Sequence, residues 1–179
     1  MTPQDILTFW FSAEGEPYWF TKSDAFDANI RAQFLAVWQQ AAAGELYPWR
    51  ATLKGRLAEI IVLDQFSRNL HRGSPLAFAQ DGMALVLAQE AMQQDGFAAM
   101  PMLERKFMLM PLMHSESAAI HAVATASFAQ YTEALTVEFE AKHKAIIDRF
   151  GRYPHRNAIL GRESSAAEIA FLQQPDSAF

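Results

Sequence analysis

The 179-residue sequence contains no cysteine, which excludes disulfide bonds and thiolate chemistry. It also lacks a long apolar run, because the unbroken stretch 107–113 is far shorter than the roughly 20 residues that span a bilayer. The first eleven residues contain Asp5 and no basic residue, which is unlike a signal peptide. We therefore expect a cytoplasmic protein with no membrane partner.

Positive charge is scarce as well, with 15 basic against 20 acidic residues and a net charge of −5. General nucleic-acid binding needs a basic face, so we expect no nucleic-acid partner. The sequence has no Gly-rich phosphate loop, no Gly-x-Ser-x-Gly elbow and no HExxH motif, and we expect no cofactor. The length and the apolar fraction of 51% are typical of one globular domain, residues 1–179.

Strand signals are missing too, since no segment alternates with period two and no Asn-Gly or Asp-Gly hairpin occurs. Apolar residues recur instead at helical spacing. This pattern predicts an all-α fold of about eight helices with short connectors, in stacked antiparallel pairs. Cap residues and prolines predict helix starts at Thr2, Ser23, Ser74, Ser115, Thr136 and Ser165, the last with the spacing of a capping box.

Charged residues lie on the apolar stripes of these helices. In the third helix the stripe continues into Asp64 and Arg68, and Asp81, His114 and His143 lie on the stripes of later helices. Burying an unpaired charge is costly, so each needs a partner. We therefore expect some of these residues to approach one another although they are far apart in sequence.

The segment 149–162, called here the arginine segment, holds four arginines, one histidine, one asparagine and no carboxylate. Arginine offers a rigid fork of donors that matches a carboxylate or a phosphate. These arginines should repel one another unless an anion lies between them. The segment therefore predicts one wall of a polar pocket for a small anionic molecule.

The candidate site combines this segment with polar residues from the other helices. The candidate proton carriers are His114 and His143, because imidazole exchanges a proton near neutral pH, with Asp64 as an orienting group. His114 and Glu116 are two residues apart and do not share a helix face, so we expect no metal site. The candidate ligand-binding residues are Arg68, Asn69, Arg72, Asp81, Glu116, Arg152, His155, Arg156, Asn157 and Arg162.

The motif Asp-x-Phe-x-Arg occurs twice, at residues 64–68 and 148–152, and each copy leads into an Arg-Asn pair, Arg68-Asn69 and Arg156-Asn157. Each copy falls at a predicted helix end. This weak repeat suggests two helix ends that are built alike.

Three stretches resemble a known family. They are LDQFSRNLHRGSPLAFAQD, MPLMHSE, and FGRYPHRN followed by LGRES. They resemble the bacterial domain-of-unknown-function 924 family, and the resemblance covers nearly the whole chain. It implies an all-helical, tetratricopeptide-like fold and implies no established activity.

Two kinds of function remain open. In the first, the polar pocket holds a small carboxylate or phosphate, either for binding or for catalysis. In the second, the chain is a tetratricopeptide-like module for a peptide or protein partner. The polar network is then purely structural, because arginine and asparagine can donate to the free carbonyls at helix ends. Enclosed arginines favour the small molecule, and an open groove favours the peptide.

Overall fold

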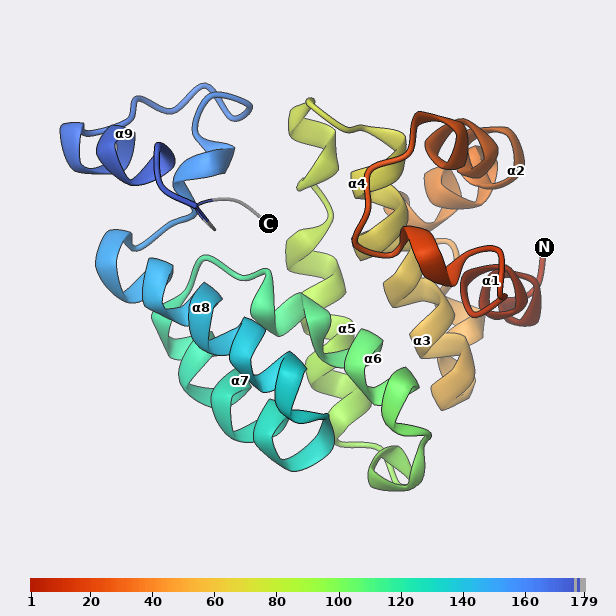
Figure 1. Cartoon of the computed structure of the whole chain (residues 1–179). Helices are drawn as coiled ribbons and strands as arrows, with labels where there is room; N and C mark the ends of the chain where they lie inside the picture. The colour runs from red at the N-terminus through yellow and green to blue at the C-terminus, as the bar shows by residue number, and fades with distance from the viewer. Residues whose placement is uncertain (176, 178–179) are drawn as a thin grey trace.

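The computed structural model describes residues 1–175 and 177, and every regular element in that part of the chain is helical. The predicted all-α class is therefore confirmed. Figure 1 shows α1 to α4 on one side of α5 and α6, and α7 to α9 on the other. The α-helices are α1 (Pro3–Trp10), α2 (Asp24–Ala42), α3 (Leu53–Ile61), α4 (Ser67–Leu70), α5 (Asp81–Met92), α6 (Met102–Met113), α7 (Ala118–Tyr131), α8 (Ala134–Phe150) and α9 (Ala166–Leu172).

A π-helical turn, Val62–Phe66, joins α3 to α4 without a break. The residues at both of its ends keep right-handed helical dihedral angles, so α3, the turn and α4 form one rod. The nine α-helices of the described residues therefore make eight rods, in agreement with the predicted number. All five residues of the turn are buried, which carries Asp64 into the interior as its place on the apolar stripe predicted.

Aromatic rings hold the N-terminal half against α6. The ring of Trp10 on α1 lies 5.7 Å from that of Phe66 in the π turn and 5.6 Å from that of Phe107 on α6. Trp19 packs on Phe107 at 4.8 Å, and its indole nitrogen donates to the carbonyl of Trp10 at 2.9 Å. Rings of this size bury much apolar surface, so they fix the π turn relative to α6.

The C-terminal half consists of α7 and α8, which lie side by side, followed by the arginine segment and α9 (Figure 1). Gly151 ends α8 with a φ of 68°, a left-handed conformation that glycine adopts without strain and that turns the chain. A short 3-10 turn, η6 (Pro154–Arg156), lies inside the arginine segment. Ser165 and Glu168 form a capping box at the start of α9, so this prediction is confirmed.

Three predicted helix starts are wrong. Ser74 caps only the 3-10 turn η4 (Pro75–Ala77), and α5 begins at Asp81. The cap of α7 is Ser117 and not Ser115. The cap of α8 is Glu133, and the predicted cap Thr136 lies inside that helix. A Ser-Pro pair starts a 3-10 turn as readily as an α-helix, so the local signal does not separate them. The tetratricopeptide-like arrangement and the single domain stay predictions.

Gly55 on α3 allows a close approach to the preceding 3-10 turn, η2 (Tyr47–Ala51). A Cβ atom at Gly55 would lie 1.9 Å from the carbonyl oxygen of Trp49. We expect Gly55→Ala to lower the free energy of unfolding by roughly 1–3 kcal/mol, because the backbone must move. Gly82→Ala on α5, where a Cβ meets nothing within 4 Å, should raise it by up to about 1 kcal/mol. Urea unfolding of both variants tests this, and stabilisation by both would contradict it.

Candidate functional site

The site begins with a buried carboxylate and a histidine. The Asp64 side chain is 1% exposed, and its Oδ1 lies 2.7 Å from Nδ1 of His114, the residue that follows α6. Nε2 of His114 has no hydrogen bond to the residues that the structure describes, and its side chain is 16% exposed. Asp64 therefore holds the ring by Nδ1, while Nε2 makes no hydrogen bond with these residues.

Arg68 on α4 joins this pair to α5. Its Nη1 lies 3.2 Å from Oδ1 of Asp64, and its two terminal nitrogens donate to the carboxylate of Asp81 at 3.0 and 3.1 Å. Burial, the largest influence, raises the pKa of Asp64, but the charge of Arg68 and the contacts with His114 and Gln65 lower it more. The net effect places the pKa of Asp64 below its usual value. Asp64 is therefore an ionised carboxylate at neutral pH.

Arg156, in η6, closes the network from the C-terminal side. Its Nη1 donates to Oδ2 of Asp81 and its Nη2 to the carbonyl of His114, both at 3.0 Å. The guanidinium lies between two rings, 4.5 Å from that of Phe78 and 4.7 Å from that of Tyr153, so cation–π attraction adds to both hydrogen bonds. Burial lowers the pKa of Arg156, while Asp81 acts in the opposite direction. We call Asp64, Arg68, Asp81, His114 and Arg156 the central network.

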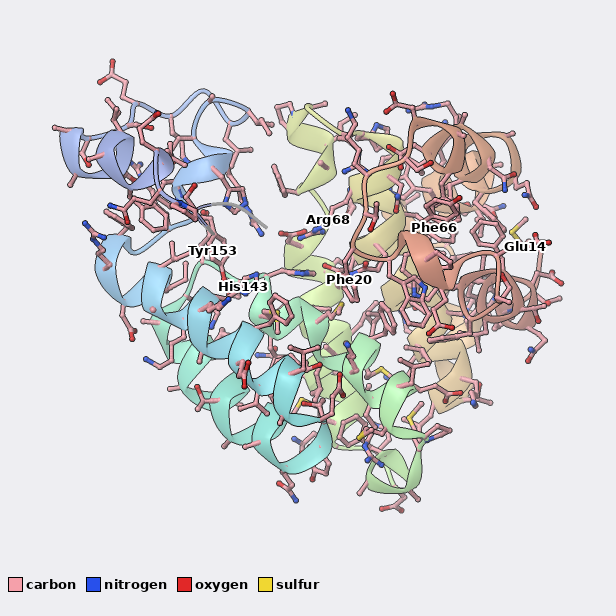
Figure 2. The ribbon with its side chains drawn as sticks, viewed as in Figure 1. Glu14, Phe20, Phe66, Arg68, His143 and Tyr153 are labelled. Atoms are coloured by element: carbon pink, nitrogen blue, oxygen red, sulfur yellow. The ribbon has the colours of Figure 1, made fainter. Side chains whose placement is uncertain are left out.

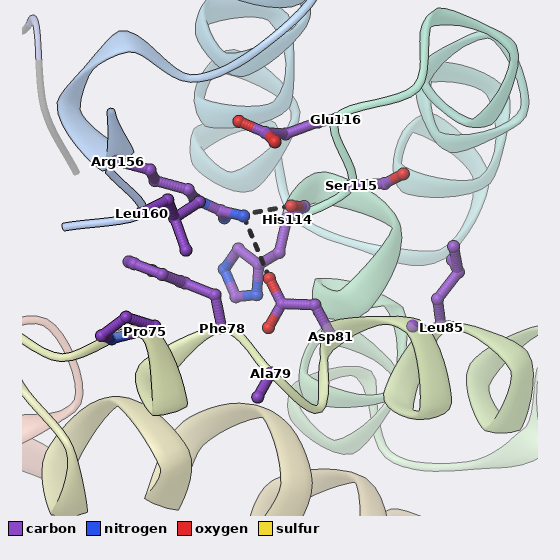
Figure 3. A pocket seen from close by; sticks show the side chains of 11 residues that line it. Pro75, Phe78, Ala79, Asp81, Leu85, His114, Ser115, Glu116, Arg156 and Leu160 are labelled. Atoms are coloured by element: carbon purple, nitrogen blue, oxygen red, sulfur yellow. Dashed lines mark hydrogen bonds and ion pairs between the residues drawn. The ribbon is translucent and has the colours of Figure 1, made fainter. Parts of the chain in front are cut away.

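A pocket of ≈ 290 Å³ opens beside the central network (Figure 3). One part of its wall is apolar and comes from η4, α5 and the arginine segment. The other part is polar and comes from α5, the α6–α7 connection and Arg156. Its lining residues are Pro75, Phe78, Ala79, Asp81, Gly82, Leu85, His114, Ser115, Glu116, Arg156 and Leu160.

A second network ties the arginine segment to α9 and to the α6–α7 connection. Arg162 binds the carboxylate of Glu116 at 2.7 and 2.9 Å and the amide oxygen of Asn157 at 3.0 Å. Asn157, which is fully buried, donates to Glu168, and Arg152 binds the same carboxylate at 2.7 and 2.8 Å. These contacts hold the segment in place.

The predicted mutual repulsion within the arginine segment is wrong. Arg152, Arg156 and Arg162 each meet a carboxylate from a different element, namely α9, α5 and the α6–α7 connection. Arg149 lies over the rings of Phe150 and Phe171 instead. The segment lacks acids of its own, but the fold supplies them.

Of the ten predicted ligand-binding residues, Asp81, Glu116 and Arg156 line the pocket. Arg68, Arg152, His155, Asn157 and Arg162 do not line it, and Asn69 and Arg72 contact α2 instead. Asn69 donates to Asp27 on α2 at 2.8 Å, and Arg72 binds the same carboxylate at 2.7 and 3.0 Å. These contacts tie the end of α4 to α2. Neither residue lines the pocket.

His143 and His155 surround Tyr153 and do not line the pocket. Their rings lie 5.7 and 5.6 Å from the tyrosine ring, and Figure 2 shows His143 next to Tyr153. Burial lowers the pKa of His143 to about 3 and that of His155 to about 4. Nδ1 of His143 donates to the carbonyl of Phe139 at 2.7 Å. Of the two candidate proton carriers, the structure brings His114 to the pocket.

Sequence reasoning missed Tyr153, which is 1% exposed and contacts three histidines, His121, His143 and His155, as well as Arg156. Its position as an aromatic residue within the arginine segment was the available signal. The repeated motif does not mark two similar sites. Asp148 is 50% exposed and pairs with Lys144, whereas its counterpart Asp64 is buried.

No group of three or more histidine, aspartate or glutamate side chains among the described residues has an arrangement that could hold a metal ion. None of the helices in that part of the chain combines the length and apolar character that crossing a bilayer needs.

The fold and the pocket define an all-α protein with a buried arginine–carboxylate network beside a histidine. The chain belongs to the family of bacterial proteins of unknown function designated DUF924, which matches residues 6–176. The resemblance seen in the sequence is thus confirmed. The structure is similar to that of a protein of unknown function from Agrobacterium tumefaciens, with a TM-score of 0.90 and 34% identity over 96% of each chain. No curated protein matches the chain.

Proposed function

We propose that the pocket binds a small organic acid, with its anionic group between Arg156 and His114 and its apolar part against Phe78 and Leu160. The observation that carries this proposal is the 2.7 Å contact between Asp64 and His114 at the pocket wall. A histidine held by a buried carboxylate and open to a pocket on its other nitrogen is suited to exchange a proton with a ligand.

The charges of the central network support an acid that binds together with a proton. The two guanidinium groups of Arg68 and Arg156 balance the two carboxylates of Asp64 and Asp81. A ligand anion alone would upset this balance in a site of low exposure. If His114 takes up a proton as the anion enters, the site stays balanced.

The roles of the residues follow from their contacts. Arg156 supplies the fixed positive charge, because stacking and two hydrogen bonds hold its guanidinium in one orientation. His114 is the proton carrier, and Asp64 is the group that orients it. This division of roles is that of general acid–base chemistry, so the pocket suits a reaction of the bound acid as well as its binding.

Three probes of one shape and different charge test the proposal: benzoate, benzamide and benzamidinium. We expect benzoate to stabilise the protein most and benzamidinium least. At ten times Kd a ligand adds about 1.4 kcal/mol, which corresponds to a rise of the melting temperature by roughly 3–6 °C for this chain length. Melting curves at matched ionic strength, with sodium chloride as reference, measure the effect. Phosphate is a fourth probe that lacks an apolar part.

Calorimetry in buffers of different ionisation enthalpy tests whether the protein takes up a proton when the ligand binds. We expect one proton to be taken up with benzoate by the native protein and none by His114→Gln. His71→Gln is the matched control, because His71 packs on Trp38 and does not line the pocket. Equal binding of all three probes would contradict the charge assignment. No binding by any probe would leave the network structural and favour the peptide-binding alternative.

A further inference from the structure

A second histidine–carboxylate pair lies behind the pocket wall. His121 on α7 is 0% exposed and Glu140 on α8 is 1% exposed, and Nδ1 of His121 lies 2.7 Å from Oε1 of Glu140. Nε2 of the same ring lies 2.9 Å from the carbonyl oxygen of Ser115 and 3.1 Å from the hydroxyl oxygen of Tyr153. Both ring nitrogens therefore face oxygen atoms.

The hydrogen-bond partners of Nε2 of His121 determine whether this nitrogen carries a hydrogen. The carbonyl of Ser115 only accepts hydrogen bonds. Tyr153 has one hydroxyl hydrogen, which it donates to the carbonyl of Met113 at 2.5 Å. The tyrosine oxygen can then only accept from His121. Nε2 faces two acceptors and must carry a hydrogen.

Nδ1 and the carboxylate of Glu140 then need one more proton between them. A bare Nδ1 facing an ionised carboxylate would place two acceptors 2.7 Å apart with no hydrogen between them. Oε2 of Glu140 is also buried and has no partner, so a full negative charge there is costly. The proton lies on Nδ1, as a histidinium–glutamate pair, or on Oε1, as a neutral pair.

We propose that His121 and Glu140 together hold one proton on the contact between Nδ1 and Oε1, and that this protonated pair positions His114. The first half follows from the hydrogen-bond partners alone. The second half rests on the proposed function, because it gives the pair a role in the pocket.

The positioning acts through three successive carbonyls at the end of α6. The carbonyl of Met113 accepts from Tyr153, that of His114 from Arg156, and that of Ser115 from His121. Carbonyls at a helix C-terminus have no donors within the helix, so these contacts decide where the backbone of His114 lies. Without the shared proton, Nδ1 would repel the carboxylate and the ring would shift away from Ser115.

Among the residues that the structure describes, the groups around the pair do not supply a competing charge at close range. Tyr153 is an un-ionised phenol, since burial raises its pKa, with Arg156 acting in the opposite direction. His143, whose pKa burial lowers to about 3, is neutral at pH 7. Glu116 and Arg156 act on Tyr153 from the arginine-segment side, and Glu116 is paired with Arg162. The proton of the pair therefore balances Glu140.

Nuclear magnetic resonance of the ligand-free protein at pH 7 tests the proton count. Nitrogen shifts of the imidazole rings and the carboxyl carbon shift of Glu140 report where each hydrogen lies. We expect a hydrogen on Nε2 of His121 together with either a hydrogen on Nδ1 or a protonated Glu140. A bare Nε2, or a bare Nδ1 with an ionised Glu140, would overturn the proposal.

Two variants test the positioning role. In Glu140→Gln the amide N–H can donate to Nδ1 while Nε2 keeps its hydrogen, so the ring signals of His114 and the Kd for benzoate should stay near those of the native protein. Glu140→Met leaves Nδ1 without a partner. We expect it to shift the His114 signals and to weaken benzoate binding by roughly fivefold or more, the equivalent of about one hydrogen bond.

The outcomes separate the two proposals. A Glu140→Met variant that melts at a lower temperature but keeps native His114 signals would overturn the positioning role and leave the pair structural. If benzoate does not bind the native protein, the proposed function fails. The proton count and the His114 signals, which need no ligand, still decide the inference about His121 and Glu140.

Discussion

Acidification from pH 7 to pH 4.5 is expected to lower the free energy of unfolding by roughly 5 kcal/mol through His143 and His155. Burial lowers their pKa values to about 3 and about 4, from the usual 6.5. A base whose pKa is lower in the folded state stabilises the fold above its unfolded-state pKa. That stabilisation is lost as the pH falls, because the unfolded chain takes up a proton that the folded chain does not.

Urea unfolding at several pH values measures this effect. Between pH 6 and 4.5 the two histidines should give a mean slope of roughly 2.4 kcal/mol per pH unit, and His143→Gln should reduce it to about half. The slope is a better readout than stability at one pH, because a merely destabilising substitution leaves it unchanged. This window lies mostly above the pKa values of unfolded carboxylates. An unchanged slope in both His143→Gln and His155→Gln, or ring protons that titrate near pH 6.5, would contradict the prediction.

Asp64→Ala is expected to lower the free energy of unfolding by roughly 3–5 kcal/mol. The substitution leaves Nδ1 of His114 without its carboxylate, and it removes one of the two carboxylates that pair with the buried guanidinium of Arg68. One positive charge in the central network is then uncompensated. Gln65 also loses the acceptor to which its side-chain amide donates at 2.6 Å. The melting temperature should fall by roughly 6–20 °C for a chain of this length.

The second copy of the Asp-x-Phe-x-Arg motif supplies the matched control. Asp148 is 50% exposed and pairs with Lys144 in α8, so Asp148→Ala should change stability by no more than about 0.5 kcal/mol. Asp64→Asn, which keeps the shape and loses the charge, should fall between the two. Similar losses for Asp64→Ala and Asp148→Ala would show that burial of the pair does not decide its contribution.

Local signals in the sequence predicted the helical fold class and some of its details. Apolar spacing of 3.6 residues does not depend on distant residues, and neither does the capping box of Ser165 and Glu168. The burial of Asp64 followed from its place on an apolar stripe. Ser74 and Thr136 misled because a hydroxyl can cap a 3-10 turn or bond within a helix as well as cap an α-helix.

The acid partners of the arginines could not be predicted in the same way. Arg156 and Asp81 are 75 positions apart, and Arg162 and Glu116 are 46 apart. Counting charges within one segment therefore says little about the charge around it in the fold. Tyr153 was missed for a related reason, since its importance comes from what packs around it.

The π turn between α3 and α4 rotates the buried face of the rod around its axis. The buried residues Leu57, Ile61, Phe66 and Leu70 are spaced by four, five and four positions, so one extra residue enters at the turn. One residue corresponds to a rotation of about 100° around a helix. The rod can therefore pack on α1 along α3 and on α2 along α4 without a break in its axis. The five-residue spacing between Ile61 and Phe66 therefore marks, in the sequence, the point where the rod changes from packing on α1 to packing on α2.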